Sequence, residues 1–352
     1  MKPFTYNALP GRIVFAPGAL TRIPEEIDRL QKQQALLIAT NSAAHLVPGV
    51  TERLGNRFAG VFTEVVQHVP TSTVKRALDV AEQVGADCVI TLGGGSAIGL
   101  GKALAREIDL PILAVPTTFS GSEMTPIYGI TDEGRKQTGR DPRVLPRAVI
   151  YDPELFYSLP FPKAVTSGMN ALAHCVEALY SNLASPITDL LAEEGSRALA
   201  SGLRVLAQNI SNLEGYHLSL YGAYLAGAAL GAVGTGLHHR ICHILGGSFH
   251  LPHAETHAVI LPHVVCYNRD AAPEAMARLA RALDAADAAQ GMIDLAAQLK
   301  APSTLAMLGL HQEQLEEAAQ LVLASPIWNP RPLTLSDMQH LLQAAYHGPP
   351  VL

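Results

Sequence analysis

The chain carries few charged residues, and basic residues are not in excess among them. Charged side chains make up 16% of the 352 residues, hydrophobic residues make up 48%, and the formal net charge is −6. Lysine and arginine are dispersed along the chain, which argues against a nucleic-acid backbone as the main partner. The apolar share argues against disorder and is ample for buried cores and a subunit interface. We expect a small-molecule partner and no nucleic acid.

The sequence also lacks paired cysteines and long apolar runs. Proline and glycine interrupt the start of the chain where a signal peptide needs an apolar run, and no stretch of about 18 apolar residues occurs. The cysteines indicate neither a disulfide framework nor a zinc–thiolate knuckle, which fits a reducing cytoplasm. We therefore expect a cytoplasmic protein without membrane contact. The four cysteines lie far apart with no CxxC pair, at Cys88, Cys175, Cys242 and Cys266.

The first part of the chain alternates short apolar runs with helical patterns. Runs of strand length occupy 34–39, 60–66, 87–92 and 111–115. Between them, hydrophobic residues over 71–85 recur at spacings of three and four, as on one face of a helix. Alternating strand and helix indicates a parallel, doubly wound sheet.

The texture of the sequence changes after Asp152. Alanine and leucine dominate, the periodicity stays near that of a helix, and strand-like runs mostly disappear. The segment 144–152 fits either a last strand or a connector. Because the length favours two domains, we predict an α/β domain over 1–156 and an all-α-helical domain over 157–352.

Glycines cluster where one predicted strand gives way to a helix. The run from Thr91 to Lys102 reads TLGGGSAIGLGK. Glycines let the backbone approach a ligand closely, and the free N–H groups at a helix N-terminus attract phosphate. The run fits either a tight turn that binds nothing or a pyrophosphate site. In the second case the binding residues are Gly93, Gly94, Gly95 and Ser96.

A second loop favours a dinucleotide site. The apolar run 111–115 leads into a hydroxyl-rich loop at the carboxyl end of a strand, where open α/β sheets bind ligands. Two such loops side by side predict a bound dinucleotide. The candidate residues of the second loop are Thr117, Thr118, Ser120 and Ser122.

Histidines cluster in the predicted helical domain. Asn170 and His174 lie four residues apart, His239 and His243 have the same spacing, and each pair therefore shares a helix face. His253 follows, and five of the fourteen histidines fall between 238 and 253. A single histidine is more often a hydrogen-bonded polar residue at a core edge. Clustering favours metal ligands or proton donors, and spacing does not choose between these roles.

Four motifs in this order resemble the iron-containing alcohol dehydrogenases, which are related to dehydroquinate synthase and glycerol dehydrogenase. The resemblance covers nearly the whole chain. It implies a dehydroquinate synthase-like fold, with an N-terminal NAD(P)-binding α/β domain, a C-terminal helical catalytic domain, an active site between them, and a homodimer. The motifs read GGGSAIGLGKALA, PTTFSGSEMTPIYGIT, SGMNALAHCVEALYS and HHRICHILGGSFHLPHAETHAVILPHV.

The resemblance also implies a metal held by one aspartate and three histidines. His174, His239 and His253 match the three histidine positions, but Asn170 stands where the aspartate is expected. A neutral amide oxygen is a weaker ligand for a hard divalent cation than a carboxylate. We therefore predict that no metal is bound.

Asn170 is one of several features that resemble the maleylacetate reductase branch of this family. Others are the runs 99–102, 126–129 and 329–332. That branch reduces the carbon–carbon double bond of maleylacetate to give 3-oxoadipate during the breakdown of aromatic rings. Such a conjugate reduction calls for hydrogen-bond donors to an enolate more than for a strong Lewis acid, which agrees with the loss of the aspartate.

The resemblance assigns roles to the clustered residues. His243 matches a catalytic histidine that is not a ligand, and we expect it to donate the proton. His174, His239 and His253 line the pocket as hydrogen-bond donors or, alternatively, as a residual metal site, and Asn170 offers its amide to the substrate. Arginine suits a dicarboxylate best. The substrate-binding candidates are Arg331, Arg240 and Arg140, with Tyr128 and Ser122 as secondary ones.

The choice of cofactor depends on the end of the first long strand. Thr40 and Asn41 stand where NAD-specific relatives tend to carry an aspartate that repels the 2′-phosphate of NADP. Because this exclusion device is missing, we predict that both NADH and NADPH are accepted. The segment 68–70 follows the next apolar run and fits either a nucleotide contact or an ordinary turn.

Three other functions stay open at this point. The first is a metal-dependent alcohol or polyol dehydrogenase that tolerates Asn170. The second is a lyase that resembles dehydroquinate synthase and uses NAD transiently, although the missing carboxylate argues against it. The third is a catalytically silent nucleotide-binding paralogue, which the retained histidines disfavour.

Overall fold

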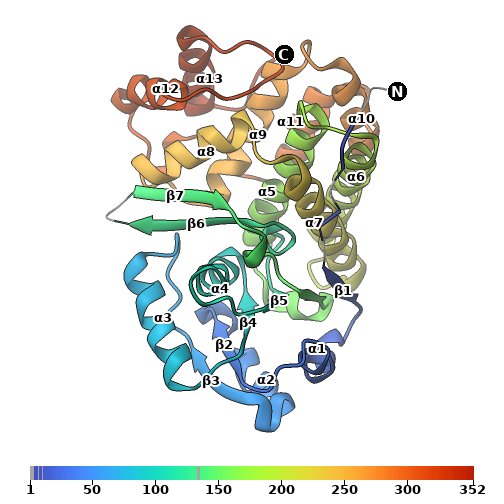
Figure 1. Cartoon of the computed structure of the whole chain (residues 1–352). Helices are drawn as coiled ribbons and strands as arrows, with labels where there is room; N and C mark the ends of the chain where they lie inside the picture. Colours follow the sequence, from blue (N-terminus) through green and yellow to red (C-terminus); the bar gives the residue numbers. More distant parts are fainter. Residues whose placement is uncertain (1–3, 7, 10, 133–134) are drawn as a thin grey trace. The chain divides into compact units, whose positions relative to one another are not determined.

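A computed structural model describes the chain except residues 1–3, 7, 10 and 133–134 (Figure 1). The described chain consists of two compact units. One is Leu9–Leu159, and the other combines Pro160–Leu352 with the described residues that precede Leu9. The division lies after Leu159, whereas the sequence texture suggests a border after residue 156.

The unit formed by Leu9–Leu159 contains a six-stranded, fully parallel sheet in the order β1-β8-β5-β4-β2-β3. All four apolar runs of the sequence contribute strands to it, and part of the segment 144–152 forms another. β1 is not among the predicted strands. The strands are β1 (Arg12–Phe15), β2 (Ala35–Ala39), β3 (Phe58–Phe62), β4 (Cys88–Gly93), β5 (Ile112–Pro116) and β8 (Ala148–Tyr151).

Helices cover this sheet because its central strands are apolar on both faces. Every residue of β2, β4 and β5 is buried, as expected of parallel strands in an α/β protein. Apolar residues of α3 and α4 pack with Leu36, Ile38 and Val89 of the sheet in one core cluster. The helices of this unit are α1 (Ile23–Arg29), α2 (Val47–Leu54), α3 (Thr71–Gln83) and α4 (Gly95–Ile108).

A two-stranded antiparallel hairpin, which the sequence patterns did not predict, stands beside the sheet. It consists of β6 (Ile127–Asp132) and β7 (Arg135–Arg140). Ile130 is buried in the cluster formed with α3 and α4, and Tyr128 packs against the same cluster. The guanidinium of Arg106 lies 4.7 Å from the centre of the Tyr128 ring. The hairpin thus covers apolar surface of the α/β unit.

The order of the strands creates one switch point. From β2 the chain moves outward to β3, whereas from β4 it moves in the opposite direction to β5 and then β8. Adjacent strand ends at such a reversal leave a crevice where nucleotides bind in doubly wound folds. In this sheet the crevice is expected at the carboxyl ends of β2 and β4.

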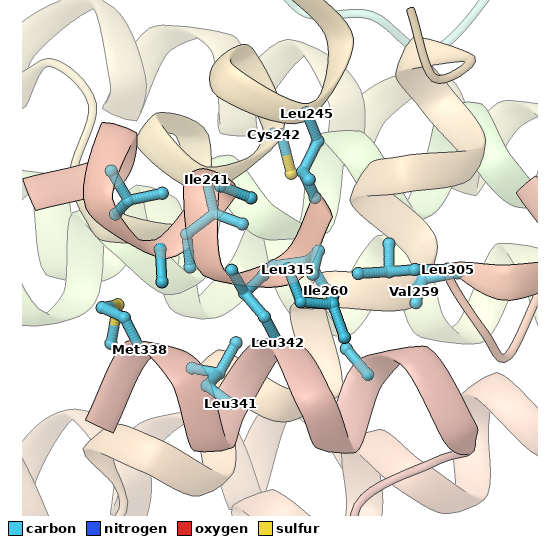
Figure 2. Packing of buried hydrophobic residues seen from close by; sticks show 14 of the residues in the cluster. Ile241, Cys242, Leu245, Val259, Ile260, Leu305, Leu315, Met338, Leu341 and Leu342 are labelled. Atoms are coloured by element: carbon cyan, nitrogen blue, oxygen red, sulfur yellow. The ribbon is translucent and has the colours of Figure 1, made fainter. Parts of the chain in front are cut away.

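The second unit is helical, as the sequence predicts. α6 and α7 pack against each other and against α5. A second core cluster joins α8 and α9 to α12 and α13 and includes Ile241, Cys242 and Leu342 (Figure 2). The helices are α5 (Phe161–Tyr180), α6 (Pro186–Gln208), α7 (Leu213–Val233), α8 (Leu237–Ser248), α9 (His253–Asn268), α10 (Pro273–Leu283), α11 (Ala288–Gln298), α12 (Leu315–Leu323) and α13 (Leu335–His347).

Within the described chain, no individual helix has the length and apolar character to cross a membrane. One pair, α7 with α8, meets the length and composition limits together, but it is bent by 98°.

Candidate active site

The glycine loop lies at the switch point of the sheet. β4 ends at Gly93 and α4 begins at Gly95. The amide of Thr40 donates to the carbonyl of Leu92 at 3.2 Å, and the amide of Thr117 donates to that of Gly93 at 3.1 Å. These bonds bring the ends of three neighbouring strands together. The predicted residues that follow them therefore gather at one edge: Asn41, Gly93, Gly94, Gly95, Ser96, Thr117 and Thr118.

Two of these glycines are required by their surroundings. Gly93 has a φ of 151°, which side chains rarely adopt. A Cβ on Gly94 would lie 2.8 Å from Oγ1 of Thr118, too close for a real contact. At Gly95 a Cβ would lie 3.7 Å from Cβ of Ser120, an ordinary contact, so the protein itself leaves room beside the first turn of α4. The first amides of that turn lack helical acceptors and offer an anion site.

The hydroxyl-rich loop is organised by a lysine that the sequence reasoning did not single out. Lys102 of α4 is fully buried, and its Nζ donates to the carbonyl oxygens of Ser122, Thr125 and Ile127 at 2.7, 2.8 and 2.7 Å. Oγ of Ser122 lies 3.3 Å from the same nitrogen. Burial lowers the pKa of Lys102 to about 7, while the nearby Glu123 acts in the opposite direction. The signal available in the sequence was a lysine seven positions after Gly95, on the same face of the predicted helix.

Glu123 is the second buried charge of this loop. Tyr151 donates to Oε1 of Glu123 at 2.8 Å, and Ser120 donates to Oε2 at 3.3 Å. Burial raises the pKa of the Glu123 carboxyl, although these hydrogen bonds and Lys102 oppose the shift. Ser120 and Ser122 thus have bonding partners inside the loop, and their roles toward a cofactor remain predictions.

The segment 68–70 has a strained backbone at the edge of the sheet. His68 and Val69 have φ values of 65° and 52°, and a branched residue such as Val69 rarely adopts this conformation. Thr131 of the hairpin holds the turn, because its Oγ1 donates to the carbonyl of His68 at 2.8 Å and its amide to that of Val69 at 3.0 Å. Asn41, in contrast, is exposed after β2. Whether segment 68–70 or Asn41 contacts the nucleotide stays a prediction.

In the helical unit, α5, α8 and α9 bring all the predicted histidines together. The ring of His174 lies 4.9 Å from that of His239, and the ring of His243 lies 6.0 Å from His239 and 6.2 Å from His253, centre to centre. His257 lies 4.5 Å from His253. Two further histidines, His238 and His257, belong to this cluster and were missed by the sequence reasoning, although both stand near the predicted ones in the chain.

Glu177 is the partner that orients His239, and it was also missed. Its Oε2 accepts from Nδ1 of His239 at 2.6 Å and from the amide of Gly236 at 2.7 Å, and its Oε1 accepts from the amide of His239 at 3.2 Å. Since a carboxylate only accepts, Nδ1 of His239 carries the hydrogen. Nε2 of His239 then has a lone pair unless the ring is protonated. The signal available was a glutamate three residues after His174, on the same helix face.

Several polar atoms of the described part of this cluster have no hydrogen-bond partner. Among the described residues, Oδ1 of Asn170, Nδ1 of His174 and Nε2 of His239 are buried without a hydrogen-bond partner. Such atoms are costly unless a substrate, water or ion satisfies them. Burial, with the neighbouring imidazoles, lowers the pKa of His174 well below its ordinary value. At neutral pH His174 is therefore a neutral imidazole in the protein alone.

This cluster differs from the ligand set that an iron ion requires. Asn170, His174, His239 and His253 offer one amide oxygen and three imidazoles, and none of them is a carboxylate. Glu177, whose carboxylate contacts His239, already accepts from the His239 ring and from two backbone amides. This set does not match the carboxylate-containing set that holds a hard divalent ion. No step of the chemistry proposed below passes through a metal.

The predicted substrate residues are divided between the two units. Arg331 lies over the Tyr267 ring, 4.2 Å from its centre, and donates to Asp337 at 3.0 Å. Arg240 is half-buried on α8 next to His239, whereas Arg140 is exposed at the end of β7. Tyr128 packs against the core of the α/β unit. Their contacts with a substrate remain predictions.

Both units match family models. Residues 10–153 match the model described as iron-containing alcohol dehydrogenase, and residues 164–346 match the C-terminal model of the same family. The chain belongs to the iron-containing alcohol dehydrogenase family, whose fold and nicotinamide cofactor were expected from the four motifs.

Its similar relatives include maleylacetate reductases. One from Burkholderia cepacia is 49% identical over 348 residues, which covers 99% of both chains. The crystal structure of the one from Agrobacterium tumefaciens has a TM-score of 0.95 at 46% identity and covers 99% of this chain and 100% of that chain. The structure from Rhizobium sp. strain MTP-10005 has a TM-score of 0.95 at 45% identity and covers 99% of both.

Proposed function

We propose that this chain is a maleylacetate reductase, an oxidoreductase that uses NADH or NADPH to convert maleylacetate to 3-oxoadipate. The observation that carries the proposal is the cluster of imidazoles around Asn170, which includes no carboxylate at the aspartate position, in a chain of which 99% aligns with proteins of that name. Such a cluster provides hydrogen-bond donors without the anionic ligand that an alcohol dehydrogenase of this family is expected to use.

The reaction has two steps that need different help. The loops after β4 and β5 would hold the nicotinamide cofactor, which would supply a hydride to the alkene carbon β to the ketone. The electron pair of the double bond would then move to the ketone oxygen as an enolate. A proton then adds to the α carbon and completes the reduction. Preorganised donors near the ketone oxygen stabilise the enolate. A positioned acid supplies the proton.

The cluster offers groups for both steps. We assign the proton donation to His243, and hydrogen bonding to the substrate to His174, His239, His253 and Asn170. The bond from His239 to Glu177 places a condition on this scheme, because Nε2 of His239 donates only when the ring is protonated. The two carboxylates of the substrate favour protonated imidazoles nearby.

The cofactor site lacks a feature that separates NADH from NADPH. Asn41 follows β2 and carries no charge to repel a 2′-phosphate. We expect values of kcat/KM that agree within about tenfold for the two cofactors, since a difference of about 1.4 kcal/mol corresponds to that ratio. Initial rates at limiting cofactor measure it, and a hundredfold preference for one cofactor would overturn the expectation.

The central test is NADH oxidation with freshly generated maleylacetate, beside a panel of simple aldehydes and with or without prior chelation. Rapid turnover of maleylacetate that resists chelation supports the proposal. A second candidate, a metal-dependent alcohol dehydrogenase, is favoured by one observation, because an imidazole whose Nδ1 is held by a carboxylate is typical of metal ligands. Turnover of aldehydes that chelation abolishes and added metal restores would establish that candidate instead.

A further inference from the structure

His238, Cys242 and His257 form a group that the proposed reaction does not use. His238 and Cys242 lie four residues apart on α8, and His257 faces them from α9. All three side chains have 0% relative exposure. One ligand atom from each residue lies within 4.8 Å of the other two. The spacing of the first two is the one by which a helix presents two ligands to the same ion.

The contacts inside this group leave its bonding capacity incompletely used. Nε2 of His238 lies 2.8 Å from Nδ1 of His257 and 3.7 Å from Sγ of Cys242. This nitrogen carries either one hydrogen or one lone pair in the plane of the ring. It can therefore form a well-aligned hydrogen bond with His257 or with Cys242, but not with both. Nδ1 of His238 and Nε2 of His257 are buried without a partner among the described residues. A single ion between Nε2 of His238, Nδ1 of His257 and Sγ of Cys242 would use these three atoms at once, and the outer ring nitrogens would then carry the hydrogens of the neutral imidazoles.

We propose that His238, Cys242 and His257 bind one divalent ion of the zinc type, with Cys242 as a thiolate and both imidazoles neutral. The separation of 3.7 Å between sulfur and nitrogen already suits a tetrahedral ion. The separation of 2.8 Å between the two nitrogens must widen to about 3.3 Å for zinc–nitrogen bonds of about 2.0 Å. A fourth position is left to another ligand.

Ligand chemistry distinguishes this group from the residues that match the family ligand set. The family-like set of Asn170 and three histidines contains no acidic side chain, whereas a Cys242 thiolate supplies a negative charge. Burial, together with the nearby Glu177, raises the pKa of Cys242. Thiolate and imidazole ligands suit zinc or cobalt(II) and are poor ligands for a hard ion. Without an ion, the buried thiol stays protonated, so the metal itself is what would deprotonate it.

Cobalt(II) provides the test because a cobalt–thiolate bond has its own absorption. The full chain is expressed in medium with cobalt as the added metal, and its cobalt content and near-ultraviolet spectrum are measured. We expect about one cobalt per chain and a thiolate-to-cobalt charge-transfer band. Cys242→Ser should remove the band and lower the cobalt content at least tenfold. Cys175→Ser is the matched control, since Cys175 is equally buried but follows His174 on α5.

His257→Gln keeps the thiol and guards against a folding defect of Cys242→Ser. With far-ultraviolet circular dichroism and Tm close to those of the parent, it should also lose most of its cobalt. The proposal is overturned by wild-type protein without cobalt, by cobalt without a thiolate band, or by a band that survives in Cys242→Ser. Cobalt that depends on His174 but not on Cys242 would place the ion at the family-like set and also overturn it. The maleylacetate assay, which reads turnover, decides the proposed function separately.

Discussion

The glycine loop of the α/β unit and the histidine cluster of the helical unit are built in opposite ways. The glycine loop uses backbone: strand ends, amides and the missing side chains of Gly93 and Gly94 shape it. The histidine cluster uses side chains from α5, α8 and α9, and its key hydrogen bond joins Glu177 to His239, 62 positions apart. A site shaped by the backbone is sensitive to substitutions that add atoms to its glycines. A site made of side chains is sensitive to the loss of any side chain that donates or accepts a hydrogen bond.

The largest effect is expected at His243. Its replacement by Asn should lower kcat for maleylacetate about 100-fold to 1,000-fold, the range typical of a lost general acid. The KM for NADH should stay within about threefold, because the cofactor loops belong to the other unit. His250→Asn is the control, as His250 is exposed in the same stretch of sequence. If both variants retain near-normal kcat, the proton comes from elsewhere.

The next effect concerns the loss of stability in acid, which we expect to arise in the helical unit. Burial lowers the pKa of His263 to about 4 from an ordinary value of 6.5, so the unfolded chain binds the proton more readily than the folded one. Stability is full above about pH 6.5 and falls as the pH drops toward 4, by about 3 kcal/mol from this residue.

Urea unfolding at a series of pH values measures this loss. In His263→Gln the dependence between about pH 6.5 and 4 should weaken by up to one proton. His340→Gln, which changes an exposed histidine of α13, should leave the dependence unaltered. An identical slope in the His263 variant would show that this histidine is not the source.

A smaller effect is expected for the residue that positions His239. Glu177→Gln leaves at least one of three N–H donors without its acceptor, so kcat should fall about tenfold to 100-fold. Unfolding should become easier by about 1–3 kcal/mol. Glu194→Gln, which removes the half-buried surface partner of Arg197, should change stability by less than about 1 kcal/mol. A Glu177→Gln enzyme with normal kcat and a normal pH profile would make this carboxylate purely structural.

The smallest effect tests the glycine loop and separates two causes. Gly94→Ala should raise the KM for NADH about tenfold, since the methyl group would displace Thr118. Gly95→Ala meets only an ordinary contact in the protein. A higher KM in Gly95→Ala therefore indicates that the cofactor itself approaches this glycine. An unchanged KM in both variants would remove the loop from the cofactor site.

What the sequence could predict follows from the same contrast. The strands β2, β4 and β5, the helix after the glycines and the all-helical second half were predictable, because apolar runs and helical periodicity are local signals. Hairpin β6–β7 was not predictable, because its sequence shows no regular alternation of apolar and polar residues. Its apolar residues are buried by contacts with α3 and α4. Candidate histidines were recognised by number and spacing. Glu177 and His257 were not, since their roles depend on contacts with α8 that only the fold creates.

Lys102 has a consequence for how the cofactor is received. Its Nζ donates to three carbonyl oxygens of residues 122–127, so the group that holds this loop in shape is part of the chain. The shape of residues 122–127 therefore needs no metal ion from the medium. A nucleotide that binds beside residues 122–127 finds this loop already ordered, so little binding free energy is spent on ordering it.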